Sequence, residues 1–144
     1  MTEPAKTQRF EVRLTSDSHF SWVRTRLSME RTLMAWVRTA TALIGFGFTI
    51  VQFFQRMEAM EGVAPAHHPE AARYLGLALI GAGIVALAVS AWQYWKLTRY
   101  MWSEPFTPLA GFGHGTTATP VLSVAVGLML IGMFAFMAVL LRFV

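Results

Sequence analysis

The chain has 144 residues, of which 55% are hydrophobic and only 14% are charged, with a net charge of +4 and no cysteine. This balance is typical of a membrane protein rather than of a soluble domain. The lack of cysteine excludes a disulfide framework, a thiolate metal site and a cysteine nucleophile.

The N-terminal region is polar up to Arg31, and no secretory signal is recognisable in it. Residues 1–17 show no helical or strand period, which predicts a flexible cytosolic tail. From Ser18 onward, apolar residues recur at helical spacing with arginines on the other faces. We therefore expect an amphipathic helix over residues 18–30 that is capped by Ser18, lies at the membrane interface and continues into the first span.

Three long apolar runs follow, each with the roughly 20 residues that a helix needs to cross a hydrocarbon core about 30 Å thick. They predict transmembrane helices over about residues 31–56, 73–100 and 119–143. We expect an all-α membrane protein in which residues 18–144 form a single three-helix transmembrane domain.

An arginine repeat enters the first span. The dipeptide Arg-Thr occurs three times at a spacing of seven, starting at Arg24, Arg31 and Arg38, so a helix stacks these arginines on one side. Small and polar residues share that side, and bulky residues on the other side are expected to face acyl chains. The small and polar set is Ala35, Ala42, Gly45, Thr49 and Gln52, and the bulky set is Leu33, Trp36, Leu43, Ile50, Val51 and Phe54.

Arg38 lies two helical turns beyond Arg31, roughly 10 Å deeper in the membrane. One interpretation is a snorkelling arginine that only anchors the helix. The other is that Arg38 is paired or hydrated by Glu30 of a neighbouring subunit, backbone carbonyls, lipid phosphate or an anionic solute, because spans two and three contain no carboxylate. Three spans cannot enclose a wet pore by themselves, so we expect a symmetric homo-oligomer.

The second predicted span has small residues at intervals of four, which allow another helix to approach closely. These residues are Ala78, Ala82, Ala86 and Ser90. Basic residues concentrate in the N-terminal segment and in the loop after this span. The positive-inside bias therefore places the N-terminus and that loop in the cytosol, and the first loop and the C-terminus outside.

The sequence offers little for an enzyme, because no Ser/His/Asp arrangement and no paired carboxylates occur in the predicted spans. His67, His68 and Glu70 form the best metal-like cluster, but adjacent histidines in a proline-containing loop are usually solvated, and their spacing matches no recognised ligand pattern. We therefore expect no catalytic residues, no metal and no cofactor. Cations beside a membrane span contact lipid phosphates more readily than nucleic acid, so we expect no nucleic-acid partner.

The string ERTLMAWVRT, starting at Glu30, resembles the signature of a bacterial family of small three-span membrane proteins, the YidH-type domain of unknown function 202. That domain also resembles the three-helix membrane unit of the eukaryotic vacuolar transporter chaperone, the polyphosphate polymerase complex. The resemblance implies a multi-pass protein of the bacterial inner membrane. It also implies a pentameric ring around a channel for polyphosphate, with basic residues of the first helix facing the conduit.

Carried over position by position, the resemblance gives pore-facing roles to Arg24 and Arg31, and to Lys96 through the aromatic residue before it. The eukaryotic units have an uncharged residue at the position of Arg38, so a role for Arg38 is not implied. Polyphosphate synthesis is not implied either, since nothing resembles the polymerase domain. We expect an arginine-lined conduit or binding ring for polyphosphate or smaller anions; the alternative is an accessory membrane protein whose arginine stripe only joins subunits or contacts anionic lipids.

Overall fold

The computed structural model describes residues 12–60, 69–111 and 120–141. The three long helices that it contains are each long and apolar enough to cross a membrane. The elements are α1 (Ser16–Glu58), α2 (Pro69–Met101), the short 3-10 helix η1 (Thr107–Ala110) and α3 (Pro120–Leu141). The prediction of an all-α protein with three membrane-spanning helices is confirmed.

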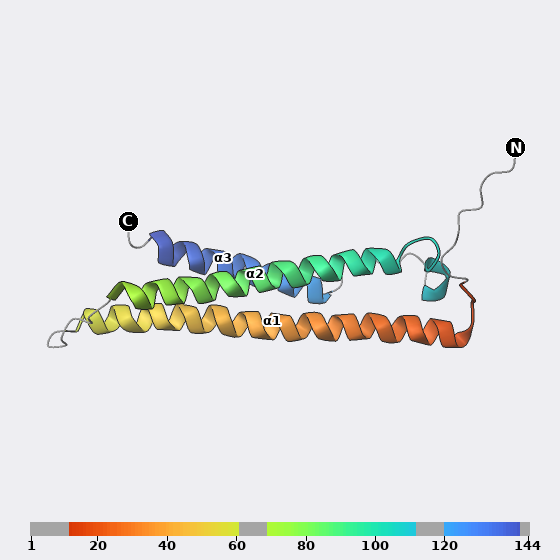
Figure 1. The fold of residues 1–144 in the computed structure, drawn as a ribbon, viewed down its shortest axis with the longest axis horizontal. Coiled ribbons are helices and arrows are strands. Elements are labelled where there is room, and N and C mark those ends of the chain that lie inside the picture. Colours follow the sequence, from red (N-terminus) through yellow and green to blue (C-terminus); the bar gives the residue numbers. More distant parts are fainter. Residues whose placement is uncertain (1–11, 61–68, 112–119, 142–144) are drawn as a thin grey trace, which may run out of the picture.

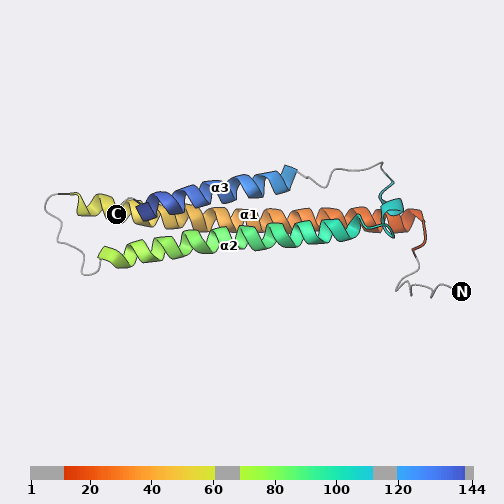
Figure 2. The same ribbon diagram turned by 90° about the horizontal axis from the view of Figure 1, so that it is seen from above.

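α2 runs antiparallel beside α1, and α3 packs alongside this pair (Figures 1 and 2). α3 is shorter and starts part-way along the pair, so the first turns of α1 and the last turns of α2 extend beyond it, with η1 next to them. We call this extension, residues 16–26 of α1, 97–101 of α2 and η1, the stalk. The fold is therefore a three-helix membrane layer with a two-helix stalk at one end.

The N-terminus of α1 is capped one turn earlier than expected. The hydroxyl of Thr15 accepts a hydrogen bond from the backbone N–H of Ser18 at 3.2 Å, and Asp17 lies in the first turn. The prediction that Ser18 is the cap is wrong, because Thr15 satisfies the free N–H group first. Residues 18–30 are continuous with the first span in one helix, and their position at the membrane interface stays a prediction.

One face of α1 forms the core of the molecule. Its buried residues alternate at spacings of four and three, the pattern of left-handed helix packing. They are Leu33, Val37, Ala40, Ile44, Gly47 and Val51. The prediction that Leu33 and Val51 face acyl chains is therefore wrong: each is only 2% exposed within the helix bundle, whereas Trp36 is 46% exposed.

Glycines let the backbones of α1 and α2 touch. A Cβ atom on Gly47 would lie 2.7 Å from the carbonyl oxygen of Gly76, and one on Gly83 would lie 2.9 Å from that of Ala40. The residue numbers of both pairs, 47 with 76 and 40 with 83, add up to 123. Along the pair, residue i of α1 therefore lies level with residue 123 − i of α2.

The same register holds in the stalk, where Trp22 Nε1 donates a hydrogen bond to the carbonyl oxygen of Met101 at 3.4 Å. Trp22 also packs edge-on against Trp102, with ring centroids 5.5 Å apart. His19 Nδ1 lies 2.7 Å from the carbonyl oxygen of Leu109, just before η1 ends. These contacts fasten the segment after α2 to the beginning of α1.

We expect Gly47→Ala to destabilise the protein by about 1–3 kcal/mol, because the new Cβ meets backbone rather than a movable side chain. Gly127→Ala is the matched control, since a Cβ there has nothing within 4 Å, and we expect it to be neutral or slightly stabilising. Thermal unfolding in mild detergent, followed by circular dichroism, measures both. Equal melting temperatures for the two variants would contradict the glycine contact.

Candidate functional site

The face of α1 opposite its core carries a second row of residues with the same alternating spacing. From Arg31 to Thr49, each member lies two positions before a core residue, which is about 200° around the helix. Arg24 and Ser28 continue the row one heptad earlier. We call this row the outer seam, and every member is exposed: Arg24, Ser28, Arg31, Ala35, Arg38, Ala42, Gly45 and Thr49. The core row of α1 is buried against the other helices, whereas the outer seam is exposed and borders α3 at Val121.

The three arginines of the outer seam make no hydrogen bond, ion pair or aromatic contact within the described residues. Other cations at the same end of the molecule rest on tryptophan rings. These pairs are Arg26 on Trp22 at 5.8 Å, Lys96 on Trp92 at 5.4 Å and Arg99 on Trp95 at 4.6 Å from the ring centroid. The side chains of Arg24, Arg31 and Arg38 are therefore available to a partner outside the chain.

Arg31 and Arg38 line one groove of about 430 Å³, with Val121 of α3 forming part of the opposite wall. α3 contains no charged residue from end to end, so its start marks the beginning of the hydrocarbon layer. Arg31 lies near that start, and Arg38 lies roughly 10 Å further along α1. Two of the arginines predicted to bind anions, Arg31 and Arg38, therefore line the same groove beside the apolar helix α3.

The threonine of each Arg-Thr dipeptide bonds within its own helix. The hydroxyls of Thr25, Thr32 and Thr39 donate to the carbonyl four residues earlier at 2.9, 3.0 and 3.1 Å. Such bonds satisfy a hydroxyl donor where water is scarce. The arginines are therefore the charged donors on this face that have no acceptor within the described residues.

Glu30 has a partner within the chain: its carboxylate lies 3.7 Å from Nε of Arg26, one turn earlier on α1. Both side chains are about one-third exposed or less, at 33% for Arg26 and 26% for Glu30. Glu30 also lines the groove of Arg31 and Arg38. Its pairing with a neighbouring subunit stays a prediction.

Lys96 lies level with position 27 of α1 in the register of the helix pair. It is exposed on α2 and does not line the groove that holds Arg31 and Arg38. A single chain therefore does not bring Lys96 together with the seam arginines, and its shared role with them stays a prediction.

Comparison with known proteins identifies the family of the chain. A family model described as a domain of unknown function, DUF202, matches residues 24–100. The chain belongs to the DUF202 family. No curated protein and no solved structure matches the chain.

The DUF202 match runs from the first seam arginine almost to the end of α2. It includes the outer seam and the glycine contacts of the helix pair, and it stops before η1 and α3. The family expected from the string that starts at Glu30 is confirmed, while the similarity to the vacuolar transporter chaperone stays a prediction.

The small-residue row on α2 of this DUF202 chain is only partly used within the chain. Ser90 is buried and Ala86 is half-buried, but Ala78 and Ala82 are exposed. The closest approach between helices runs through glycines instead. Packing of Ala78 and Ala82 against another chain stays a prediction.

Two grooves between α1 and α2 were not foreseen from the sequence. One lies near the stalk and is lined by Thr32, Trp36, Ser90 and Gln93 among others. It depends on the register of the pair, for which the sequence contains no local signal.

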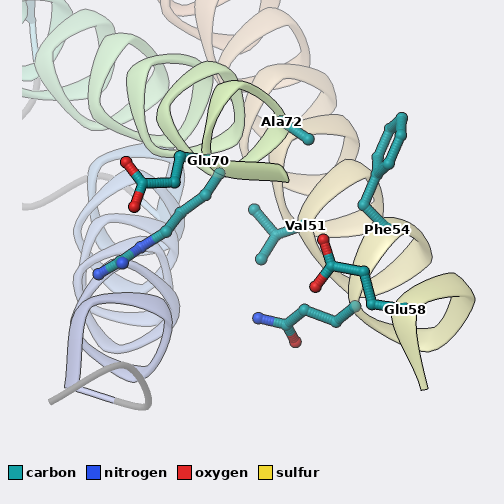
Figure 3. Close-up of a pocket in the computed structure, with 7 residues that line it drawn as sticks. Val51, Phe54, Glu58, Glu70 and Ala72 are labelled. Atoms are coloured by element: carbon teal, nitrogen blue, oxygen red, sulfur yellow. The ribbon is translucent and has the colours of Figure 1, made fainter. Parts of the chain in front are cut away.

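The other groove lies where α1 ends and α2 begins (Figure 3). Val51 lies between Glu58 of α1 and Glu70 of α2, and the Glu70 side chain extends away from α1. The described residues contain no group of three potential metal ligands, and His67 and His68 lie outside them. This second groove therefore presents no assembled metal site.

We expect Arg38→Ala to change the unfolding free energy of the detergent-solubilised monomer by no more than about 0.5 kcal/mol, because this exposed side chain makes no hydrogen bond, ion pair or ring contact within the described residues. The neighbouring substitution Val37→Ala removes a side chain that is 7% exposed, so we expect a loss of about 1–3 kcal/mol. Thermal unfolding measured by circular dichroism compares the two. A similar loss for both would mean that Arg38 has a structural role within the chain.

Proposed function

We propose that this chain forms a homo-oligomer in which the outer seams converge on a common axis, so that stacked rings of arginine bind and conduct polyphosphate or smaller anions. The observation that carries the proposal is the row of three arginines on an exposed face of α1, none of which has a polar or aromatic partner within the described residues. The deepest of them, Arg38, shares a groove with the apolar helix α3.

The cost of placing a charge in hydrocarbon favours this arrangement over a lipid-facing seam. An arginine at the centre of a bilayer costs about 2.5–3.5 kcal/mol on insertion scales, and snorkelling removes most of that cost only near the interface. Arg31 is close enough to the start of α3 to reach lipid phosphates, whereas Arg38 is about two turns deeper. A watery axis shared with other copies would hydrate Arg38.

Closed rotational symmetry would convert each seam arginine into one ring. The seven-residue spacing places successive rings roughly 10 Å apart along the axis. Rings of arginine favour anions in pores, and an extended polyanion can contact several rings at once, which strengthens binding over a single phosphate. The resemblance to the vacuolar transporter chaperone unit supports polyphosphate as the anion and five as the number of subunits.

We further propose that the protein lies in a bacterial inner membrane with the stalk in the cytosol and the C-terminus outside. Support comes from basic residues in the stalk or directly beside it, because positive residues concentrate on the cytoplasmic side. They are Arg24, Arg26, Lys96 and Arg99.

The second candidate function is an accessory membrane protein whose seam holds subunits together or contacts anionic lipids without transport. It is favoured by the position of Arg24 and Arg31, which lie on the stalk and near the start of α3, at the depth of lipid phosphates. This second function accounts less well for Arg38, because Arg38 lies about two turns deeper than Arg31 and so further from the lipid phosphates.

For the protein reconstituted in liposomes, we expect phosphate or polyphosphate flux above that of empty vesicles. Arg31→Ala and Arg38→Ala remove one ring each, and we expect each to lower the flux about tenfold or more, as loss of a charged hydrogen-bond donor contributes about 1.5–3 kcal/mol. Arg56→Ala, an exposed arginine in the last turn of α1, is the charge-matched control. Absence of flux, or flux unchanged by Arg31→Ala, would refute the conduit.

The cysteine-free sequence permits a direct test of the oligomer. We expect Ala35→Cys, in the outer seam, to give a ladder of cross-linked species in the membrane with a short bifunctional thiol reagent. Phe134→Cys, on α3 at a position 77% exposed, is the control and should remain monomeric. A ladder that Arg31→Ala abolishes, combined with no flux of any anion, would favour the accessory function.

A further inference from the structure

Two tryptophans and two cations occupy one exposed side of α2 next to the stalk. Lys96 Nζ lies 5.4 Å from the ring centroid of Trp92, and the guanidinium carbon of Arg99 lies 4.6 Å from that of Trp95. Each cation follows its ring by four residues, and the two pairs are offset by three, so all four are neighbours on the helix surface. All four are exposed. We call them the tryptophan-cation face.

The tryptophan-cation face continues the side of α2 against which α3 packs. α3 meets α2 at Gly81, where an added Cβ would lie 3.9 Å from the Phe136 ring, and at Ile84, which lies 3.1 Å from a Cβ built on Gly132. Arg99 follows Gly81 by 18 residues, which is five helical turns, so both lie on the same side of α2. α3 starts part-way along the helix pair (Figures 1 and 2). Beyond that start, this side of α2 is exposed.

The level of this face in the membrane follows from the register of α1 and α2. Trp92 lies level with Arg31 of α1, which lines a groove together with Val121 at the start of α3. Lys96 and Arg99 lie roughly 6 and 10 Å further toward the stalk. The head-group layer on each side of the hydrocarbon core is about 5–8 Å thick. The two cations are therefore at the level of lipid phosphates, and the Trp92 ring is at the edge of the apolar layer.

The positive charge of this face is not balanced by the described residues. The rings attract Lys96 and Arg99 but accept no conventional hydrogen bond. Neither cation has a hydrogen bond or an ion pair within the described part of the chain, and Glu104, five residues after Arg99, pairs with neither. Residues 112–119, which connect η1 to α3, contain no carboxylate. The donors of both cations are therefore available to an anionic partner.

A phospholipid matches this face better than a soluble anion or a second copy of the chain. A free phosphate would use the cations and leave the two rings in water, although Trp92 and Trp95 are 58% and 44% exposed. The same face of a second copy would bring like charges together. A phospholipid offers a phosphate to the cations and apolar carbons to the rings. A net anionic head group is favoured, because the choline of a zwitterionic lipid is repelled by both cations.

We propose that the tryptophan-cation face binds one anionic phospholipid of the leaflet next to the stalk. Lys96 and Arg99 hold its phosphate. Trp92 and Trp95 contact its glycerol and the first carbons of its acyl chains. The face belongs to α2 alone, so this binding does not depend on the proposed conduit. It gives Lys96 a role different from the pore-facing one that the family resemblance implies.

Native mass spectrometry of the full-length protein counts the lipids bound per chain in micelles that contain equal amounts of phosphatidylglycerol and phosphatidylcholine. We expect one phosphatidylglycerol per chain to bind about tenfold or more tightly than phosphatidylcholine, because each of the two cations contributes about fivefold toward an anionic lipid. Lys96→Gln and Arg99→Gln should each weaken this binding about fivefold.

Matched controls separate the effects of charge and ring from general ones. Arg56→Gln removes the same charge as Arg99→Gln from the opposite end of the molecule and should leave the binding unchanged. Trp95→Leu should weaken the binding about two- to fivefold, because the ring that holds Arg99 is lost. Trp36→Leu removes an equally exposed ring, 46% against 44%, over which no cation of the described residues lies. It should have no effect.

Three results would overturn the proposal. Equal binding of the two lipids would show that the charge of the face selects nothing. Binding that is lowered by Arg31→Gln and unchanged by Lys96→Gln and Arg99→Gln would place the lipid on the outer seam. Displacement of phosphatidylglycerol by excess inorganic phosphate, but not by sodium chloride of the same ionic strength, would show a site for free phosphate instead of a lipid.

Discussion

The contact that the rest of the structure depends on is the glycine-mediated approach of α1 and α2. Inside a bilayer, water does not drive helices together, so association relies on van der Waals contact and on close backbone approach. Gly47 against Gly76 and Gly83 against Ala40 provide that approach. They also fix the register that places Trp22 beside Met101 in the stalk and Ser90 at the level of Leu33 in the groove.

This pairing occupies one face of α1 and leaves an equally regular face unused. A seven-residue repeat stays on one side of a helix only when the helices supercoil around each other in the left-handed sense. The core face follows this repeat because α2 packs on it. The outer seam follows it from Arg24 to Thr49, with small residues between and beyond the arginines. A snorkelling anchor needs one arginine near the interface and no small residues beside it, so the seam has the form of a second helix-packing face.

Hydropathy and arginine spacing are local properties, and they were sufficient to predict the three spans and the face that holds Arg24, Arg31 and Arg38. They did not reveal which bulky residues of α1 lie inside the bundle. Leu33 and Val51 are buried and Trp36 is exposed, yet lipid and protein core favour the same apolar side chains. The cap was missed because Thr15 and Ser18 are equally good candidates from the sequence.

The unpredicted parts of the site share one cause, which is the register between helices. Alanines and glycines are both small, and only the offset of α2 along α1 makes Gly76 and Gly83 the contact residues and leaves Ala78 and Ala82 outside. The same offset brings Ser90 to the groove beside Thr32. Sequence periodicity within one helix contains no information about that offset.

The cations at the stalk end fall into two groups that differ in their surroundings. Arg26, Lys96 and Arg99 rest on tryptophan rings, an arrangement suited to the head-group region, where both ring and charge are favourable. The seam arginines stack on no ring in the part of the chain that the structure describes, and the deepest of them, Arg38, lies beside α3. If both groups served only to bind lipid, the charge of Arg38 would lie in the hydrocarbon layer, at a cost in free energy, and too deep to contact lipid phosphates. The partners that we propose, a hydrated anion for the seam and lipid head groups for the tryptophan-stacked cations, would account for both groups.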